Sequence, residues 1–358
     1  MARAATATIN LNAIRHNYLL AKNASPENKA VAIIKADAYG HGAIKVAQSL
    51  EDIADAFGVA CIEEAIELRE AGITLPILLL EGFFTADELD YISQNNLWCA
   101  VHSVDQIKII ADTELSKPIK IWLKMDSGMH RLGVHPDQYE AAYQELKSLP
   151  QVEEVVLMSH FASADEPQKN TTAEQISCFD AVASKLDAPV SLANSAGTMA
   201  HPDARRSWQR PGIMLYGATP FAESQELADQ LKAAMTLSSE VIAVRELQPG
   251  DAVGYSGKWV CDKPSRVGTV AMGYADGYPR HAKNGTPVLV DGKLTQIIGR
   301  VSMDMLAVDL TALPEAGVGS HVEFWGDNLK ASEVATYCDT IPYTLFTGIT
   351  RRVHKKYI

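Results

Sequence analysis

The segment VAIIKADAYGHG, residues 31–42, places a lysine directly after an apolar run. A buried ammonium is costly, and a desolvated lysine is the side chain that forms Schiff bases with carbonyl cofactors. Tyr39 follows four residues later, and two glycines allow the backbone to approach a ligand closely. Lys35 is therefore a candidate nucleophile, although a lysine at the end of a strand more often just extends into solvent.

A histidine and a second lysine also end apolar runs. His160 lies at the end of VEEVVLMSHF, and Lys124 lies near the end of PIKIWLKMD. Strand alternation in the second run places four residues on one face: Lys120, Trp122, Lys124 and Asp126. If that face is interior, the Lys124 ammonium needs a partner. Taken singly, the histidine fits a core residue and the lysine fits a salt bridge to a neighbouring carboxylate.

The elements that position these residues alternate between short apolar runs and helical patterns. The predicted strands are 30–36, 56–61, 76–82, 97–103, 118–126, 152–161, 189–195 and 210–217. Eight strands, most of them followed by a helix, predict an α/β fold with a TIM-like (β/α)8 barrel over residues 1–230. In such a barrel the C-terminal ends of the strands face the active site.

The pattern changes after residue 230. Residues 231–358 alternate apolar and polar positions between Gly, Pro and Asp-Gly turns, and Asp291-Gly292 is a strong hairpin signal. The sequence therefore predicts a mostly β C-terminal domain. No Gly/Ser-rich linker separates the two parts, so we expect them to pack firmly.

Net charge, apolar run length and cysteine spacing limit the partners and the cellular location that the sequence predicts. The 358 residues carry a net charge of -12 without basic clusters, which argues against nucleic acid and anionic membranes as partners. No apolar run reaches the roughly 18 residues of a membrane span, and no signal peptide is visible, so a cytoplasmic enzyme is expected. Five scattered cysteines without a CxxC pair predict neither a disulfide framework nor a metal site.

A series of motifs resembles the alanine racemases along nearly the whole chain. They are AIIKADAYGHG, KMDSGMHRLG, SHFASADE, NSAG, RPGIMLYG, VGYSGKW, GYADGYPR, GRVSMDM and IPYTLFTGITRRV, in this order. The resemblance implies a pyridoxal-phosphate barrel followed by a β domain, and an enzyme that interconverts L-alanine and D-alanine. It also implies that Lys35 carries pyridoxal 5'-phosphate as an internal aldimine.

The same resemblance implies the residues that hold the cofactor. The phosphate is assigned to Tyr39, Ser195, Gly212, Ile213 and Tyr343. This agrees with the use of loops after strands seven and eight for phosphate in barrel enzymes, although Ser195 alone would fit a helix N-cap.

Arg210 is assigned to the pyridine nitrogen. An always-charged guanidinium will not readily protonate that nitrogen, which makes the ring a weaker electron sink and favours reprotonation at Cα over transamination.

Racemisation needs an acid–base group on each face of the substrate, and the resemblance assigns these roles to Lys35 and Tyr255. A free phenol has a pKa of about 10 and needs help to act near neutral pH. The resemblance implies that His160 supplies it by contacting both Tyr255 and Arg210.

The remaining implied roles concern the substrate carboxylate and the assembly. In relatives the lysine at position 124 is often carbamylated and holds Arg131, which reaches toward the substrate carboxylate. Further substrate contacts are implied for Tyr274, Met303 and Asp304. Together with Tyr255, these three come from the partner subunit, so the resemblance implies a homodimer with shared active sites.

Other functions remain open from the residues. A broader-specificity amino-acid racemase is the nearest alternative, although such enzymes tend to be exported. A barrel-type amino-acid decarboxylase pairs the pyridine nitrogen with a carboxylate, so Arg210 speaks against it. A non-catalytic pyridoxal-phosphate carrier is a lone barrel and has no use for a β domain, and a metal-dependent barrel hydrolase lacks suitable ligand spacing. The sequence does not decide between D-alanine synthesis for cell-wall precursors and D-alanine breakdown.

Overall fold

Eight parallel strands close into a barrel in the computed structural model, which describes residues 3–358. Each strand pairs with the next along the chain. The last strand also pairs with the first, where Trp208 lies opposite Lys29, and this pairing closes the barrel. The strands are β2 (Lys29–Ile33), β3 (Ala56–Val59), β4 (Ile77–Leu79), β5 (Leu97–Val101), β6 (Ile119–Lys124), β7 (Val152–Met158), β8 (Val190–Ser191) and β9 (Trp208–Gln209). The predicted barrel is confirmed.

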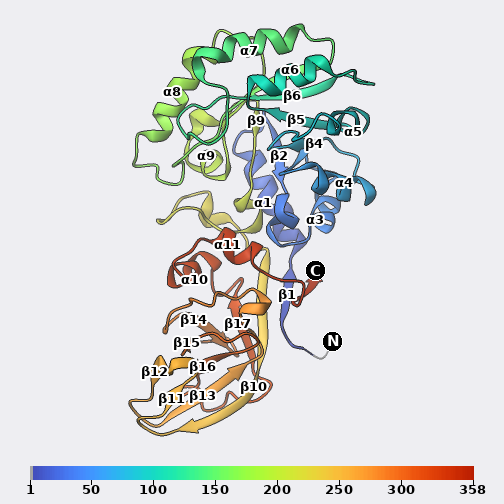
Figure 1. Ribbon diagram of the computed structural model, residues 1–358. Coiled ribbons are helices and arrows are strands. Elements are labelled where there is room, and N and C mark those ends of the chain that lie inside the picture. The colour runs from blue at the N-terminus through green and yellow to red at the C-terminus, as the bar shows by residue number, and fades with distance from the viewer. Residues whose placement is uncertain (1–2) are drawn as a thin grey trace.

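Helices surround the barrel, as Figure 1 shows. They are α1 (Leu11–Asn23), α3 (Ala43–Leu50), α4 (Ile62–Glu70), α5 (Glu88–Gln94), α6 (Val104–Asp112), α7 (Pro136–Ser148), α8 (Thr171–Ala183) and α9 (Ser195–Ala200). Local sequence sets their starts: the Asn10 side chain caps α1 by accepting from the N–H of Ala13 at 3.0 Å, and Pro136 opens α7. Strands β3, β4 and β5 are buried throughout, which explains their unbroken apolar runs.

Three tryptophans fill the barrel interior. The ring centroids of Trp98 and Trp122 lie 6.0 Å apart, and Trp208 meets both edge-on at 5.3 and 5.6 Å. The face of β6 that carries Trp122 and Lys124 is therefore the interior one, which decides a choice that strand alternation left open. The barrel is a packed core that leaves space only at the C-terminal ends of its strands.

The eighth strand differs from its prediction. Residues 210–217 were expected to be extended, but the strand is β9 at residues 208–209. Pro211 has no N–H for a strand ladder, and the chain turns there into the short 3-10 helix η2 (Ile213–Tyr216). The loop that results carries Gly212 past the mouth of the barrel.

The second unit is an eight-stranded sheet in the order β13-β16-β15-β14-β17-β10-β1-β18. Its strands are β1 (Thr6–Ile9), β10 (Met235–Leu247), β13 (Ser265–Val270), β14 (Pro287–Val290), β15 (Lys293–Ile298), β16 (Leu306–Asp309), β17 (His321–Trp325) and β18 (His354–Tyr357). A small ribbon, β11 (Ala252–Val253) with β12 (Trp259–Val260), and helices α10 (Ala331–Tyr337) and α11 (Pro342–Thr347) accompany it. Asp291 and Gly292 form the predicted β14–β15 turn, both with positive φ.

The first strand of the chain belongs to this second sheet. β1 pairs antiparallel with β10 and parallel with β18, so it lies between strands that follow it by more than 200 residues. The predicted division had placed these residues with the barrel, within 1–230. Figure 1 shows β1 descending from the barrel into the sheet, next to the C-terminus.

The two units share one hydrophobic core, so the expected firm packing is found. Helix α11 packs against the residues after β2, and Lys355 of β18 forms an ion pair with Asp37. Among residues 3–358, no helix has the length and apolar character needed to cross a membrane.

Candidate active site

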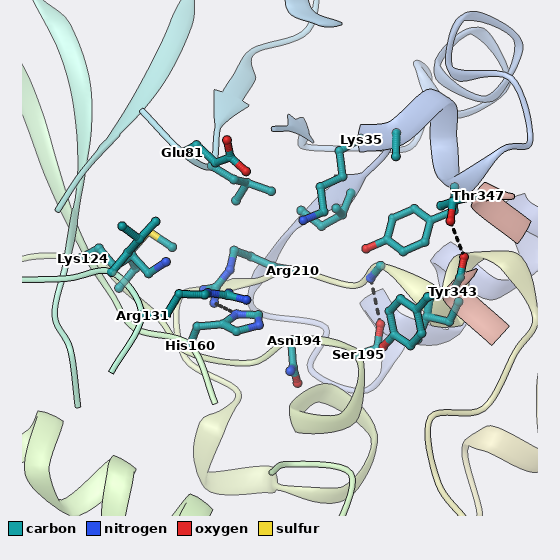
Figure 2. Close-up of a pocket in the computed structure, with 18 residues that line it drawn as sticks. Lys35, Glu81, Lys124, Arg131, His160, Asn194, Ser195, Arg210, Tyr343 and Thr347 are labelled. Carbon is teal, nitrogen blue, oxygen red and sulfur yellow. Dashed lines mark hydrogen bonds between the residues drawn. The ribbon is translucent and has the colours of Figure 1, made fainter. Parts of the chain in front are cut away.

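A cavity of about 470 Å³ opens at the C-terminal ends of the barrel strands (Figure 2). Ten residues singled out from the sequence line it together. Nine come from the barrel, and one comes from α11: Lys35, Tyr39, Lys124, Arg131, His160, Ser195, Arg210, Gly212, Ile213 and Tyr343. The structure therefore brings residues up to 308 positions apart, Lys35 and Tyr343, into one site.

The backbone at Lys35 differs from the predicted strand end. β2 stops at Ile33, and Lys35 begins α2 (Lys35–Tyr39), a turn in which residues 36–39 all have φ of 52–53°. Left-handed backbone is unfavourable for residues with a Cβ atom, and four such residues in succession require support from their surroundings.

Side-chain hydrogen bonds supply that support. The Glu64 carboxylate accepts from the N–H of Ala36 at 2.6 Å, and the Asp37 carboxylate accepts from the N–H of Ala43 at 2.8 Å. At Gly40 an added Cβ would lie 2.2 Å from the carbonyl oxygen of Phe346, so only glycine fits there. The turn is fixed on both sides, and the Lys35 side chain points into the cavity (Figure 2).

A buried histidine completes the turn. Nδ1 of His41 lies 3.0 Å from the carbonyl oxygen of Tyr39 and 3.1 Å from that of Ala38. Carbonyls only accept, so Nδ1 carries the proton. Burial lowers the pKa of His41 to about 4, and the imidazole is neutral at physiological pH.

One end of the cavity presents hydroxyl and backbone N–H groups. The Ser195 hydroxyl accepts from the N–H of Gly212 at 2.8 Å. Asn194, not Ser195, caps α9, by accepting from the N–H of Gly197 at 2.9 Å. Burial raises the pKa of Tyr39 and, to about 12, that of Tyr343, so both phenols remain protonated donors.

An arginine and a histidine lie at the centre. Arg210 is buried and donates to the carbonyl oxygens of Ser159 and Ser191 at 2.6 and 2.9 Å. Its Nη2 lies 3.4 Å from Nδ1 of His160. Burial lowers the pKa of Arg210 to about 10, which leaves it charged at neutral pH. Burial, together with the charge of Arg210, holds the pKa of His160 well below its usual range.

The opposite end is rich in cations. Lys124 is 7% exposed, and its pKa is lowered to about 8 by burial and by repulsion from Arg210, Arg131 and Lys35. Among residues 3–358 it forms no salt bridge, so the expected alternative of a carboxylate partner is not found. Four cationic side chains around one cavity favour an anionic ligand.

Sequence reasoning missed several lining residues. Glu81, the one carboxylate among them, follows β4, and the rule that strand ends face the site could have found it. Asn194 stands next to Ser195 in the NSAG motif. The other six carry no chemical signal that points to a site: Ile33, Ala36, Leu80, Leu132, Met158 and Thr347.

Four predicted site residues lie outside this cavity, in the β domain. Tyr255, Tyr274, Met303 and Asp304 are absent from its lining. Tyr255 is 67% exposed and Met303 is 53% exposed. The cavity of a single chain is therefore built from the barrel and α11 alone.

The family model described as alanine racemase, N-terminal domain, matches residues 9–220, and that of the C-terminal domain matches residues 234–357. The chain is 58% identical to an alanine racemase of Pseudomonas taetrolens over 99% of both chains.

Two solved structures give the same result. The biosynthetic alanine racemase of Pseudomonas aeruginosa is 48% identical, with a TM-score of 0.97 over 99% of both chains. The alanine racemase of Bartonella henselae with covalently bound pyridoxal phosphate is 30% identical, with a TM-score of 0.89 over 99% of both chains.

Proposed function

The chain belongs to the alanine racemase family, pyridoxal-phosphate-dependent isomerases that interconvert L-alanine and D-alanine, and we propose which of its residues carry out that reaction. One observation carries the proposal. The cavity has hydroxyl and N–H groups at one end, cations at the other, and Lys35 and Arg210 between them (Figure 2). This order suits the cofactor phosphate at the first end, the pyridine nitrogen near Arg210 and the substrate carboxylate at the cationic end.

The residues present fit pyridoxal phosphate. The Ser195 hydroxyl, the N–H of Ile213 and the phenols of Tyr39 and Tyr343 suit a dianionic phosphate. At Gly212 an added Cβ would lie 2.8 Å from the Tyr39 oxygen, so the backbone passes close to this end. Nε of Arg210 makes no hydrogen bond within residues 3–358 and is available to the pyridine nitrogen. When bound, the cofactor supplies an electron sink that acidifies the Cα–H of the amino acid.

We assign proton transfer at Cα to two groups. Nζ of Lys35 serves one face of the substrate, and the phenol of Tyr255 of the partner subunit serves the other. Arg210 can only donate, so its contact makes Nδ1 of His160 an acceptor and leaves the proton on Nε2. An Nε2–H donor facing Tyr255 would stabilise the phenolate and lower the pKa of that tyrosine.

The substrate carboxylate is assigned to Arg131 and to three partner residues, Tyr274, Met303 and Asp304. We further propose that Lys124 is carbamylated by carbon dioxide. The support is chemical: a lysine with a lowered pKa and no carboxylate partner is a good nucleophile, and the product would be an anion next to Arg131.

The proposed assembly is a homodimer with shared active sites. Its support is that Tyr255, the residue assigned to the second face of the substrate, does not line the cavity of its own chain. Tyr255 and Met303 are both exposed in the single chain, so their side chains are free to contact a partner subunit. The five unpaired cysteines support the cytoplasm as the location.

Mixed dimers test the shared site. Lys35→Ala and Tyr255→Ala chains are each expected to be inactive, but a mixed dimer contains one complete site and one doubly substituted site. Random pairing makes about half of the dimers mixed, so activity should return to about a quarter of wild type. Co-expression ensures that mixing occurs. No recovery in proven mixed dimers would show that both residues serve the same subunit.

A second experiment tests the cofactor assignment without relying on activity. Borohydride reduction of the purified yellow protein should fix pyridoxal phosphate on Lys35, as peptide mapping would show. Label on Lys124 or on no lysine would refute the assignment. A racemisation assay over a panel of amino acids measures how broad the specificity is.

A further inference from the structure

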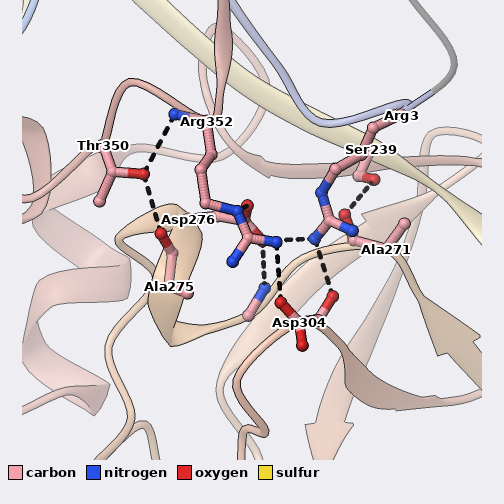
Figure 3. Close-up of polar contacts among 9 residues, drawn as sticks. Arg3, Ser239, Ala271, Ala275, Asp276, Asp304, Thr350 and Arg352 are labelled. Atoms are coloured by element: carbon pink, nitrogen blue, oxygen red, sulfur yellow. Dashed lines mark hydrogen bonds and ion pairs between the residues drawn. The ribbon is translucent and has the colours of Figure 1, made fainter.

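One buried carboxylate joins the two loops that carry Tyr274, Met303 and Asp304 (Figure 3). Asp276 is fully buried, and its Oδ2 lies 2.6 Å from Nη2 of Arg3 and 2.9 Å from the N–H of Gly273. Its Oδ1 lies 3.3 Å from Nε of Arg352, an ion pair without hydrogen-bond geometry. Two guanidinium groups thus compensate a charge that would otherwise be costly to bury.

Both arginines also bind the second loop, at Asp304. Nη2 of Arg3 donates to the carbonyl oxygen of Asp304 at 2.8 Å, and Nη2 of Arg352 donates to the Asp304 carboxylate at 2.8 Å. Asp276 therefore reaches Asp304 through two separate cations, one from near the start of the chain and one from near its end.

The loops also touch directly. The N–H of Ala275 donates to the carbonyl oxygen of Met303 at 2.9 Å, and the N–H of Tyr274 donates to that of Ser302 at 3.0 Å. An added Cβ at Gly273 would lie 2.3 Å from the Met303 carbonyl oxygen. The Thr350 hydroxyl fixes the far side by donating to the carbonyl oxygen of Ala275 at 2.8 Å.

This arrangement leaves donors without partners. Among residues 3–358, the N–H groups of Met303 and Asp304 make no hydrogen bond. Two adjacent free N–H groups suit an anion such as a carboxylate. The Asp304 side chain would repel that anion, but Arg352 holds and neutralises it.

We propose that Asp276, Arg3 and Arg352 are positioning residues that hold the loops of Tyr274 and Met303–Asp304 ready to receive the substrate carboxylate in the partner subunit's active site. The proposal rests on the shared site proposed above. The Asp276 carboxylate is fully buried and both arginines are paired with carboxylates, so each of the three acts through the loops and not on the reacting atoms.

The first test is Asp276→Asn, which keeps the size of the side chain and removes the charge. KM should rise about tenfold for both L-alanine and D-alanine, because both present the same carboxylate, while kcat changes less than about threefold. Cofactor absorbance and occupancy should stay unchanged, because the cofactor lies in the barrel. Asp339→Asn is the matched control, since Asp339 pairs with Lys283 at 2.6 Å in the same domain, far along the chain from these loops.

Arg352→Gln provides a second variant in case Asp276→Asn does not fold. The Arg352 side chain is 38% exposed, so its loss is tolerable, and it removes both contacts to the carboxylates. The same KM rise is expected. An unchanged KM in a folded Asp276→Asn or Arg352→Gln protein would overturn the proposal.

Mixed dimers then locate the effect. In a dimer of Lys35→Ala and Tyr255→Ala chains, the complete site takes its β-domain loops from the Lys35→Ala chain. Asp276→Asn should raise KM only when it is placed on that chain, and not when it is placed on the Tyr255→Ala chain. An equal effect from both placements indicates general destabilisation and refutes the proposal.

The two hypotheses fail separately. If Lys35→Ala and Tyr255→Ala chains do not complement each other, the shared site is wrong, and KM of the Asp276→Asn homodimer alone decides whether Asp276 positions the loops.

Discussion

Arg210 donates to Nδ1 of His160 across 3.4 Å, and this contact determines where the imidazole carries its proton. The arginine has no acceptor to offer, so the proton lies on Nε2. A neutral histidine that donates from Nε2 can stabilise a phenolate beyond the boundary of its own chain. In the dimer proposed above, the Nε2–H of His160 would face the phenol of Tyr255 of the partner subunit, a residue that is 67% exposed in its own chain.

The first prediction concerns the two faces of the substrate. Tyr255→Phe removes one acid–base group and should lower racemisation by about 10²–10⁴-fold. Exchange of the Cα hydrogen with deuterium, followed by NMR, should persist for one enantiomer and collapse for the other. Tyr337→Phe, at another exposed tyrosine, is the control. An equal loss of exchange for both enantiomers would contradict a two-base mechanism.

The second prediction concerns the phosphate end of the cavity. Gly212→Ala forces a methyl group against the Tyr39 oxygen, where only 2.8 Å is available. Overpacking of this kind typically costs about 1–3 kcal/mol. It is relieved by displacing the Tyr39 hydroxyl from the phosphate end, so the apoenzyme should bind pyridoxal phosphate less tightly. Fluorescence titration measures the change. Gly317→Ala is the matched control, because nothing lies within 4 Å of its added Cβ. If the Gly212→Ala and wild-type apoenzymes bind pyridoxal phosphate equally tightly, Gly212 is not part of the phosphate site.

The third prediction concerns Lys124. Carbon dioxide reacts with a neutral amine, and the lowered pKa of about 8 means that the neutral fraction rises as pH increases through that value. Carbamate occupancy should therefore increase between about pH 7 and pH 9. A ¹³C NMR carbamate signal from protein in ¹³C-bicarbonate should disappear in Lys124→Gln. It should remain in Lys120→Gln, whose lysine lies on the same strand but is paired with Glu154.

The fourth prediction concerns His41 and stability. Its pKa is about 4 in the folded chain, against about 6.5 in an unfolded one, so the unfolded chain binds an extra proton between these values. Stability should then fall as pH decreases from about 6.5 to 4. His41→Asn keeps a donor for the Tyr39 carbonyl but does not titrate. Between pH 6.5 and pH 4, the free energy of unfolding should decrease in both proteins, and the decrease should be about 3 kcal/mol smaller in His41→Asn than in wild type. Urea denaturation measures the free energy of unfolding of each protein. An equal decrease in the two proteins would contradict a buried, neutral His41.

Several features followed from the sequence because they depend on periodicity and residue type. Alternation grouped Lys124 with Trp122 on one face of β6, and eight apolar runs predicted the barrel. The left-handed turn after Lys35 could not be predicted, because a run of Ala, Asp, Ala and Tyr carries no signal for positive φ. That backbone is imposed by side chains distant in sequence, such as Glu64. The eighth strand was misplaced because apolar composition does not separate a strand from a short helix.

The hydrogen bonds of β1 have a consequence for how the chain is made. During synthesis β1 emerges before the barrel strands, but β10 and β18, its two neighbours, emerge only after them. The barrel can close while both edges of β1 are still unpaired, and the second sheet is complete only once β18 has been made. No single cut in the chain separates the two domains. A fragment beginning at residue 231 would therefore lack the strand that joins β18 to the rest of its sheet.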